Sequence, residues 1–300
     1  MRRMNKLLNK IIIVLIITII GIYGKNYILK SYSYQEEPRT NNITDNSLLT
    51  IHYLNVGQAD SILINNKEDT MLIDAGNNSD GENIVKFIKN QNIKDIDILV
   101  GTHPHEDHIG GLDNIINNFD IGKIYMPDAT TNTKTFETVL EAIENKNYNI
   151  NIPKIDEEFN LGNMKFKVIY TGTDESDLNN TSIVLKMIYG STSYLFTGDA
   201  TDITEEKILN KDIKADVLKI GHHGSSYSTT NKFLNVVNPK HGVISVGKDN
   251  KYNHPSEQTI KKLNKNKIET YRTDLDGTIK VTSDGKNINI EKLNISLDGE

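Results

Sequence analysis

Short apolar or alternating segments, bounded by turn residues, recur from residue 49 to residue 290. This pattern is typical of β-strands, and it predicts strands at residues 49–54, 61–64, 71–73, 96–100, 121–126, 161–170, 182–189, 192–196, 216–220, 243–246, 269–271, 277–282 and 288–290. Apolar residues at helical spacing predict helices at 82–89, 112–118, 136–143 and 257–263, the last with Ser256 as its N-cap. Because helices alternate with strands, we expect a layered α+β fold.

The amino-terminal stretch differs from the rest. It carries four Lys or Arg residues among its first ten positions and then an apolar run at residues 11–22. A basic start followed by such a run is typical of a membrane anchor or signal peptide, with the basic flank left in the cytoplasm. We expect residues 1–29 to be this segment, with its cleavage left open, and residues 30–47 to be a polar linker. Residues 48–293 are expected to form one extracytoplasmic domain, membrane-anchored or secreted.

The composition limits the binding partners and the metal ligands that the chain can have. The formal net charge of −6 argues against a broadly basic nucleic-acid surface, although a local patch near bound cations could still hold phosphates. The chain has no cysteine, which excludes a disulfide partner, a thiolate metal ligand and a lipidated cysteine. Any metal ion must therefore be held by His, Asp and Asn side chains.

The run Thr-His-Pro-His-Glu-Asp-His-Ile-Gly-Gly at residues 102–111 directly follows the apolar strand predicted at 96–100. His103 and His105 are two apart and can point the same way, whereas Asp107 and His108 fall on the next turn and point to a neighbouring position. This spacing suits two adjacent cations better than one. A polar loop would explain a single histidine, but four ligand-type residues in six positions favour a metal site.

Other candidate ligands follow predicted strands elsewhere. Five of the eight histidines fall in two clusters, the second being His222 and His223, and His254 lies in a similar loop. Asp199 ends a strand beside a glycine and is a candidate bridge between two cations, although Gly-Asp is also a common turn. Asp60 and Asp74 lie at strand-loop junctions, where they are either site residues or plain turn formers. His52 and His241 lie within predicted strands and are expected to be structural.

The motif at residues 103–108 resembles the HxHxDH motif of the metallo-β-lactamase superfamily. The order of Asp74, this motif, Asp199 and a late histidine is also similar, and the resemblance covers roughly residues 49–290. It implies a four-layer αββα sandwich that holds two divalent metal ions at the edges of its sheets.

Further stretches resemble the hydrolase domain of the ComEC competence proteins, which take part in DNA uptake. These stretches are residues 55–60, 196–200, 222–225 and 253–255. In those proteins the domain is attached to a multi-span channel, whereas this chain has one apolar segment. It therefore resembles a stand-alone form, to which a role in uptake does not transfer automatically.

The chain departs from the superfamily pattern in two places. Ala59 stands where glycine is usual, and no histidine occurs between residues 108 and 222, where most members have a further ligand. The ComEC-type pattern has Asn-Thr-Ser there, matched by residues 180–182. The resemblance then implies a first metal on His103, His105 and Asp199 with more water, so that zinc and manganese both remain open.

The hypothesis that follows is a dinuclear metal-dependent hydrolase, a phosphodiesterase or nuclease that attacks DNA with a metal-activated water. Asp107, His108 and one of His222 or His223 would hold the second metal with Asp199. The catalytic residues would be Asp107, His222 and His254, with the histidines binding phosphate or protonating the leaving oxygen. Residues that orient the imidazoles or contact substrate would be Asp60, Asp74, Asn180, His222 and Ser225.

Two alternatives stay open. The first is hydrolysis of a small extracellular substrate, a phosphocholine ester or a β-lactam, with no role in DNA uptake. The absence of a clear Lys or Arg stripe favours it over long DNA. The second is a degenerate domain that only binds a partner outside the cell.

Overall fold

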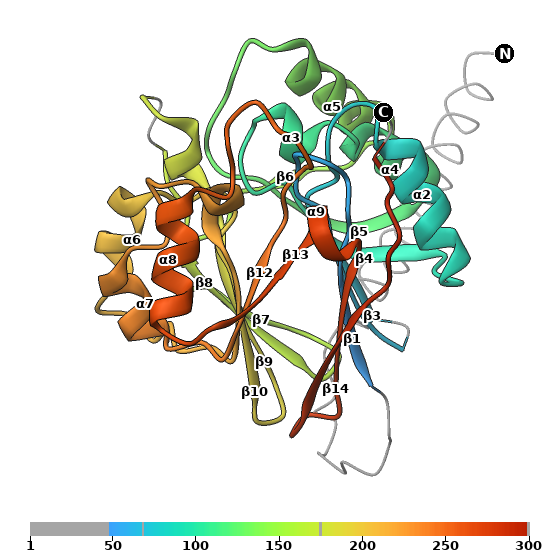
Figure 1. The fold of residues 1–300 in the computed structure, drawn as a ribbon. Helices are drawn as coiled ribbons and strands as arrows, with labels where there is room; N and C mark the ends of the chain where they lie inside the picture. Colours follow the sequence, from blue (N-terminus) through green and yellow to red (C-terminus); the bar gives the residue numbers. More distant parts are fainter. Residues whose placement is uncertain (1–47, 68, 174–175, 299–300) are drawn as a thin grey trace, which may run out of the picture. The chain divides into compact units, whose positions relative to one another are not determined.

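Two β-sheets stacked face to face, with helices on both outer sides, make up the residues that this computed structural model describes (Figure 1). The described residues are 48–67, 69–173 and 176–298, and they belong to one unit that spans residues 47–300. The predicted anchor and linker, residues 1–47, lie outside them. Within the described ranges, no helix combines the length and apolar character needed to cross a bilayer.

The first sheet has eight strands and changes from antiparallel to parallel pairing along its width. In spatial order its strands are β15 (Ile288–Lys292), β14 (Ile279–Ser283), β1 (Leu49–Tyr53), β2 (Ile62–Asn66), β3 (Asp69–Ile73), β4 (Asp95–Val100), β5 (Asp120–Tyr125) and β6 (Ile150–Asn151). The strands β1, β2 and β3 form an antiparallel meander, and β3 to β6 run parallel. Because parallel strands end at the same edge, the loops after β3 and β4 meet there.

The second sheet has seven strands and delivers the other half of the site. Its order is β13 (Glu269–Arg272), β12 (His241–Ile244), β11 (Val217–Lys219), β10 (Thr192–Phe196), β9 (Val184–Tyr189), β8 (Met164–Tyr170) and β7 (Glu158–Leu161). The strands β10 to β13 run parallel, so the loops after β10, β11 and β12 also share one edge. The strand predicted at 161–170 is present as β8 but begins three residues later, because Gly162, with a φ of +53°, allows a tight turn that separates β8 from the unpredicted β7.

Helices cover the outer face of each sheet, as Figure 1 shows for α2 and α4 on one side and α6, α7 and α8 on the other. The helices of the first layer are α2 (Gly81–Asn90), α3 (Glu106–Ile109), α4 (Leu112–Asn118) and α5 (Lys134–Asn145). Those of the second are α6 (Asp202–Ile208), α7 (Asn231–Val237) and α8 (Glu257–Lys265). Short turns complete the chain, namely α9 (Thr273–Asp276) and the 3-10 helices η1 (Leu178–Thr181) and η2 (Gly221–Gly224).

Most predicted elements are present, and the αββα arrangement is confirmed. The predicted N-cap of α8 is confirmed as well, because the Ser256 hydroxyl accepts a hydrogen bond from the Thr259 amide at 3.1 Å. The helices α6 and α7, of seven residues each, were not predicted.

The main core fills the space between the two sheets. Ile51 and Tyr53 of β1 and Phe166 and Val168 of β8 belong to one hydrophobic cluster, and all four are buried. Removing such side chains from water contributes about 1.5–3 kcal/mol each. The alternate residues of the first sheet, such as Leu63, pack instead against α2, α4 and α5. This double-sided packing holds the two sets of strand ends in place.

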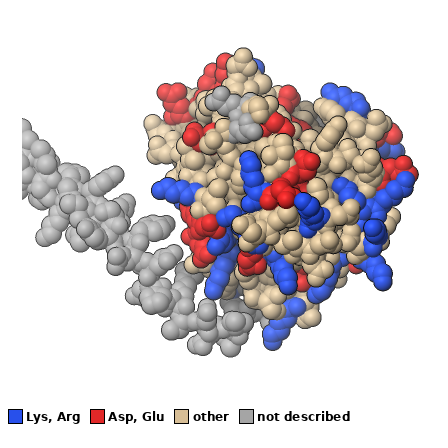
Figure 2. Space-filling model, turned by 90° about the vertical axis from the view of Figure 1, so that its left-hand side faces the viewer, with Lys and Arg blue, Asp and Glu red and all other residues tan. Residues whose placement is uncertain are grey.

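The surface is mixed in charge on the side that carries α6, α7 and α8. Figure 2 shows Lys and Arg side chains interspersed with Asp and Glu over that face, with no broad area of one sign. This observation agrees with the small negative net charge of the chain. On this face, a polyanion has no extended basic track to follow.

Candidate metal centre

The loop after β4 carries the histidine motif and passes into α3. It packs against the loop after β3 so closely that side chains are excluded: a Cβ on Gly110 would lie 2.3 Å from the carbonyl carbon of Asn77. A Cβ on Gly111 would lie 2.4 Å from the carbonyl oxygen of Ala75. This close approach at the two glycines locks the loop onto its neighbour.

The rings of His103 and His105 contact one another. The Nε2 atom of His103 lies 2.9 Å from Nδ1 of His105, and His103 is fully buried. Nδ1 of His103 faces two hydroxyl groups, with Thr102 Oγ1 at 3.2 Å and Ser182 Oγ at 3.4 Å. Burial and the neighbouring His108 hold the pKa of His103 well below its ordinary value. A neutral imidazole is the form that binds metal ions.

A second group converges beside this pair. The potential ligand atoms of Asp107, His108, Asp199 and His223 all lie within 4.8 Å of one another. Nε2 of His108 is 3.3 Å from Asp199 Oδ2, and Nε2 of His223 is 3.3 Å from Asp107 Oδ2 and 3.5 Å from Asp199 Oδ2. The sequence left His222 and His223 as alternatives, and the fold places His223 in this group.

The residues of this group fit a divalent cation. Nε2 of His108, Nε2 of His223 and Oδ1 of Asp199 are buried and have no hydrogen-bond partner. Leaving such a polar atom buried and unpaired costs about 1–3 kcal/mol. Imidazole nitrogens and carboxylate oxygens are ligands that zinc and manganese both accept. A bound ion would satisfy all three atoms at once.

The rings of His108 and His223 also form hydrogen bonds on their Nδ1 sides, which face away from the cluster. Nδ1 of His108 donates to Asp74 Oδ2 at 2.8 Å, and the same carboxylate accepts bonds from the amide and hydroxyl of Thr102, both at 2.7 Å. Nδ1 of His223 donates to the carbonyl oxygen of Ser245 at 2.9 Å. Because each Nδ1 carries its proton toward these acceptors, each Nε2 faces the cluster.

Charges inside the cluster determine its protonation. Burial alone would lower the pKa of His108, but Asp199, Asp74 and Asp107 together raise it well above its ordinary value. Burial also lowers the pKa of His223, yet Asp199 and Asp107 raise it to about 9. The pKa of Asp199 stays well below its usual range, because His108 and His223 outweigh its burial. Without a cation the two histidines thus hold protons that a metal ion must displace.

A cavity of about 310 Å³ opens over this group. His222 lies on its wall with Nε2 3.7 Å from Asp199 Oδ2, and its ring centroid is 5.7 Å from that of His254. Burial lowers the pKa of both rings. Tyr252, which is 54% exposed, also lines the cavity and stacks on His254 at 5.8 Å. These rings are placed to contact a bound substrate, while His223 faces the cluster below.

The remaining predicted residues have mainly supporting contacts. The side chain of Asn180 is fully buried, accepting bonds from the hydroxyls of Thr201 at 2.7 Å and Thr204 at 2.8 Å. It therefore braces the start of α6 and does not face the cavity. The hydroxyl of Ser225 accepts a bond from the Tyr227 amide at 3.3 Å and stabilises its own turn.

Three residues near the site were not singled out from the sequence. Thr102 supports Asp74, and Ser182 accepts a bond from the Asp199 amide at 3.1 Å while facing His103. Lys219 is fully buried and pairs with Asp60 at 2.8 Å. Of these three residues, only Lys219 could have been identified from the sequence, because a lysine inside an otherwise apolar strand needs a buried partner.

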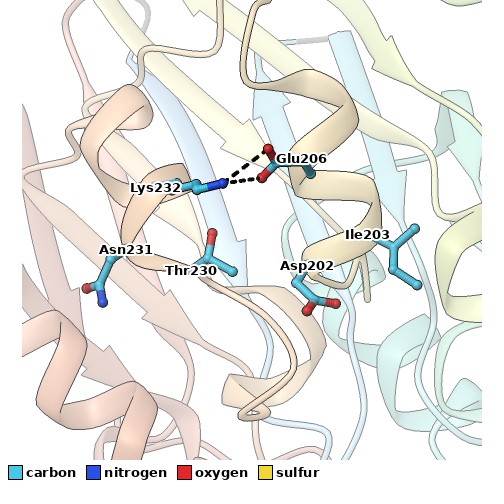
Figure 3. A pocket seen from close by; sticks show the side chains of 6 residues that line it. All are labelled: Asp202, Ile203, Glu206, Thr230, Asn231 and Lys232. Carbon is cyan, nitrogen blue, oxygen red and sulfur yellow. Dashed lines mark hydrogen bonds and ion pairs between the residues drawn. The ribbon is translucent and has the colours of Figure 1, made fainter.

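A larger hollow of about 450 Å³ lies between α6 and α7 (Figure 3). Its lining residues are Asp202, Ile203, Glu206, Thr230, Asn231 and Lys232. Lys232 and Glu206 form an ion pair at 3.2 Å there, and both side chains are mostly exposed. An exposed pair of this kind contributes about 0–1 kcal/mol. With no histidine in its lining, this hollow lacks the chemistry of the smaller cavity.

Comparison with known families decides the identity of the fold and its chemistry. Residues 54–248 match the family described as the Metallo-beta-lactamase superfamily. The chain belongs to the metallo-beta-lactamase superfamily. Members of this superfamily are generally metal-dependent hydrolases, and the candidate ligands described above agree with that membership. The resemblance expected from the HxHxDH motif is thereby confirmed.

Among curated superfamily relatives, the chain is 31% identical over 250 residues to ComE operon protein 3 of Bacillus subtilis (strain 168). That match covers 76% of this chain and 32% of that protein. It is 29% identical over 227 residues to Competence protein ComA of Neisseria gonorrhoeae, covering 74% of this chain and 30% of that protein. The chain is thus a superfamily hydrolase related to competence proteins, and it spans about a third of their length.

Solved structures support the fold. The metallo-beta-lactamase fold protein YhfI from Bacillus subtilis aligns with a TM-score of 0.52 at 12% identity, covering 79% of this chain and all of that one. CmlA, a diiron beta-hydroxylase from Streptomyces venezuelae, aligns with a TM-score of 0.54 at 16% identity, covering 80% of this chain and 54% of that one. At these identities the likeness concerns the fold alone.

Proposed function

We propose that this chain hydrolyses phosphodiester bonds, with DNA as its substrate class, using a water molecule and two divalent metal ions. The position of Asp199 carries the proposal. Its Oδ2 atom lies 3.3–3.7 Å from the Nε2 atoms of His108, His222 and His223, and its Oδ1 atom has no hydrogen-bond partner. A buried carboxylate in the middle of converging imidazoles is suited to bridging two cations.

Each residue has a role in this scheme. Asp107, His108, Asp199 and His223, whose ligand atoms converge, would hold one ion. His103 and His105, which contact each other beside this group, would hold the other together with Asp199. The bound ions supply the acidity that makes water a nucleophile near neutral pH and the positive charge that a phosphate attracts. His222 and His254, on the wall of the cavity, bind the phosphate oxygens or give a proton to the leaving oxygen.

The choice of DNA is supported by the named relatives. They include a ComE operon protein, a competence protein and Recombination protein 2 of Haemophilus influenzae, which is 25% identical over 235 residues. A phosphodiester also suits the cavity of about 310 Å³, because the histidines that line it can bind phosphate oxygens.

The test uses the purified chain, loaded with Mn²⁺ or Zn²⁺, on single-stranded DNA, duplex DNA and a nitrophenyl phosphodiester. We expect turnover of all three and its loss in His105→Ala, because that change removes a proposed ligand. His241→Ala is the matched control, since His241 lies in β12, paired with Glu269 and away from the cavity. No turnover by the wild type with either metal, or an unchanged rate in His105→Ala, would reject the proposal.

The charge distribution favours a second candidate, a small substrate that is either a phosphocholine ester or a β-lactam. The net charge is −6, and the face seen in Figure 2 has no continuous basic area to hold a long polyanion. A salt titration separates the two candidates. Turnover of DNA should weaken steeply as salt rises, whereas turnover of a small substrate should barely respond.

We also propose that the domain works outside the cytoplasm, on the basis of the basic start and the apolar run at residues 11–22. The absence of cysteine allows a clean test, because Lys286→Cys introduces a single thiol at an exposed position. A membrane-impermeant maleimide should label this variant in intact cells that produce the full chain. Labelling only after lysis would contradict the proposal.

A further inference from the structure

Lys219, the last residue of β11, is a fully buried charge directly beneath the metal centre. Its ammonium group contacts Asp60 Oδ2 at 2.8 Å and donates to the carbonyl oxygen of Ile220 at 2.9 Å. A buried charge is costly and persists only with a partner. Because Lys219 belongs to the second sheet and Asp60 to the loop before β2 in the first, this pair crosses between the two halves of the site.

Asp60 connects Lys219 to two of the candidate ligands, Asp107 and His223. Its amide donates to the carbonyl oxygen of Asp107 at 3.0 Å, and its carbonyl oxygen accepts from the Gly76 amide at 2.9 Å. Its second carboxylate oxygen, Oδ1, is buried without a hydrogen-bond partner and lies 3.5 Å from Nδ1 of His223. The carboxylate thus faces Lys219 with one oxygen and a candidate ligand with the other.

His223 needs such support, because its backbone is in an unusual conformation. His222 and His223 both have positive φ values, 49° and 51°, a region that costs a non-glycine residue about 1–2 kcal/mol. The ring of His223 must nevertheless direct Nε2 at Asp107 and Asp199. Nδ1 donates to the Ser245 carbonyl oxygen at 2.9 Å, and the negative oxygen of Asp60 at 3.5 Å further favours the orientation in which Nδ1 carries the proton and Nε2 faces the cluster.

We propose that Lys219 is a positioning residue for the metal centre: through Asp60 it holds His223 with Nε2 directed at Asp107 and Asp199. The role requires metal binding at this cluster and does not depend on the substrate. Without the ammonium group, Asp60 loses its partner in the second sheet, and its carboxylate is free to turn toward the cluster and compete with His223. The expected consequence is weaker metal binding in a folded protein.

The experiment measures Zn²⁺ affinity of the metal-free full chain by competition with a chelator, alongside its melting temperature. Lys219→Met should weaken zinc binding about 10–100-fold, the usual effect of losing a group that orients a metal ligand. The double variant Lys219→Met/Asp60→Asn removes both charges, so it should recover stability while its zinc binding stays weak. If Lys219 and Asp60 formed a purely structural ion pair, zinc affinity would recover together with stability in the double variant.

Lys186 provides the matched control. It is also a buried lysine of the second sheet, 5% exposed, and it pairs with Asp212 at 2.8 Å. Lys186→Met should lower stability but keep zinc affinity within about two-fold of the wild type, because Lys186 has no contact with the ligands. Equal zinc affinity in the wild type and in both Lys219 variants would overturn the proposal. So would an equal loss of affinity in Lys186→Met, or a wild type that binds no zinc.

Histidine ring-nitrogen NMR of the zinc-loaded chain gives a second readout. In the wild type we expect zinc on Nε2 of His223, with the proton on Nδ1. In the double variant we expect a mixture of Nε2 and Nδ1 binding. A signal from His223 that is identical in the two proteins would contradict a positioning role, whatever happens to stability.

Discussion

His52 and His223 are both buried histidines, yet their surroundings drive their protonation in opposite directions. His52 lies in β1 against the ring of Phe87, and burial together with Lys280 lowers its pKa to about 4. His223 lies between Asp107 and Asp199, which raise its pKa to about 9 in spite of its burial. Burial is therefore shared by a histidine within a strand and a histidine of the candidate metal centre, and the neighbouring charges distinguish them.

The largest expected effect comes from removing the carboxylate of Asp199, which raises the pKa of His223. Asp199→Asn keeps the size of the side chain but removes the anionic oxygens that face His108 and His223. We expect phosphodiester turnover to fall on the order of a thousand-fold. The pKa of His223 should also fall toward that of an ordinary buried histidine, measured by NMR titration of the metal-free chain. If the rate and the pKa both stay at wild-type values, Asp199 has neither role.

His52 should dominate a different measurement, the pH dependence of stability. Its folded-state pKa of about 4 lies below the ordinary 6.5. Between these two pH values the unfolded chain therefore binds a proton at His52 that the folded chain does not bind. The stabilisation is fully present above about pH 6.5 and is lost as the pH falls through this window toward 4. The loss is about 3 kcal/mol in the free energy of unfolding.

Denaturant unfolding of the wild type and His52→Leu at pH 7 and pH 4.5 measures this difference. Leucine is apolar and of similar size, so the variant should lose less stability than the wild type on acidification. Parallel losses in the two proteins would show that His52 does not titrate in this way.

Metal binding should stabilise the site with its own pH dependence. An ion that binds only the folded chain adds about 2.7 kcal/mol at a hundred-fold excess over its Kd. Since His108 and His223 hold protons in the metal-free protein, the gain should grow as the pH rises from about 6 to about 9. Thermal unfolding with Zn²⁺ or with chelator checks this. The His223→Ala variant should lose most of the stabilisation by metal, and the His52→Leu variant should keep it. The reverse result would mean that His52, and not His223, takes part in metal binding.

The smallest effect is expected at His241, the other strand histidine. It pairs with Glu269 at 3.2 Å, and the glutamate is 63% exposed. A pair of this kind contributes less than about 1 kcal/mol. His241→Ala should therefore change the melting temperature slightly and leave zinc affinity unchanged. A large drop in zinc affinity would extend the metal centre beyond the strand ends.

The sequence alone was sufficient to predict the layered fold and the histidines and aspartates that converge in the candidate site. Strand periodicity places the motif at residues 102–111 and the His222–His223 pair directly after apolar strands. Parallel strands then bring their following loops to one edge, so convergence follows from local patterns and a general rule of sheet geometry. The hairpin at Gly162 was missed, because a two-residue turn interrupts an apolar pattern without changing it.

Only the tertiary structure distinguished neighbours with the same chemistry. It placed His223 and not His222 in the ligand group, turned Asn180 toward the threonines of the α6 region, and left Ser182 facing His103. It also paired Lys219 with Asp60 across the two sheets. Local spacing determines which side chains share a loop, whereas the contacts between loops from different sheets depend on how the sheets pack. That packing is a property of the whole core and has no counterpart in any short stretch of sequence.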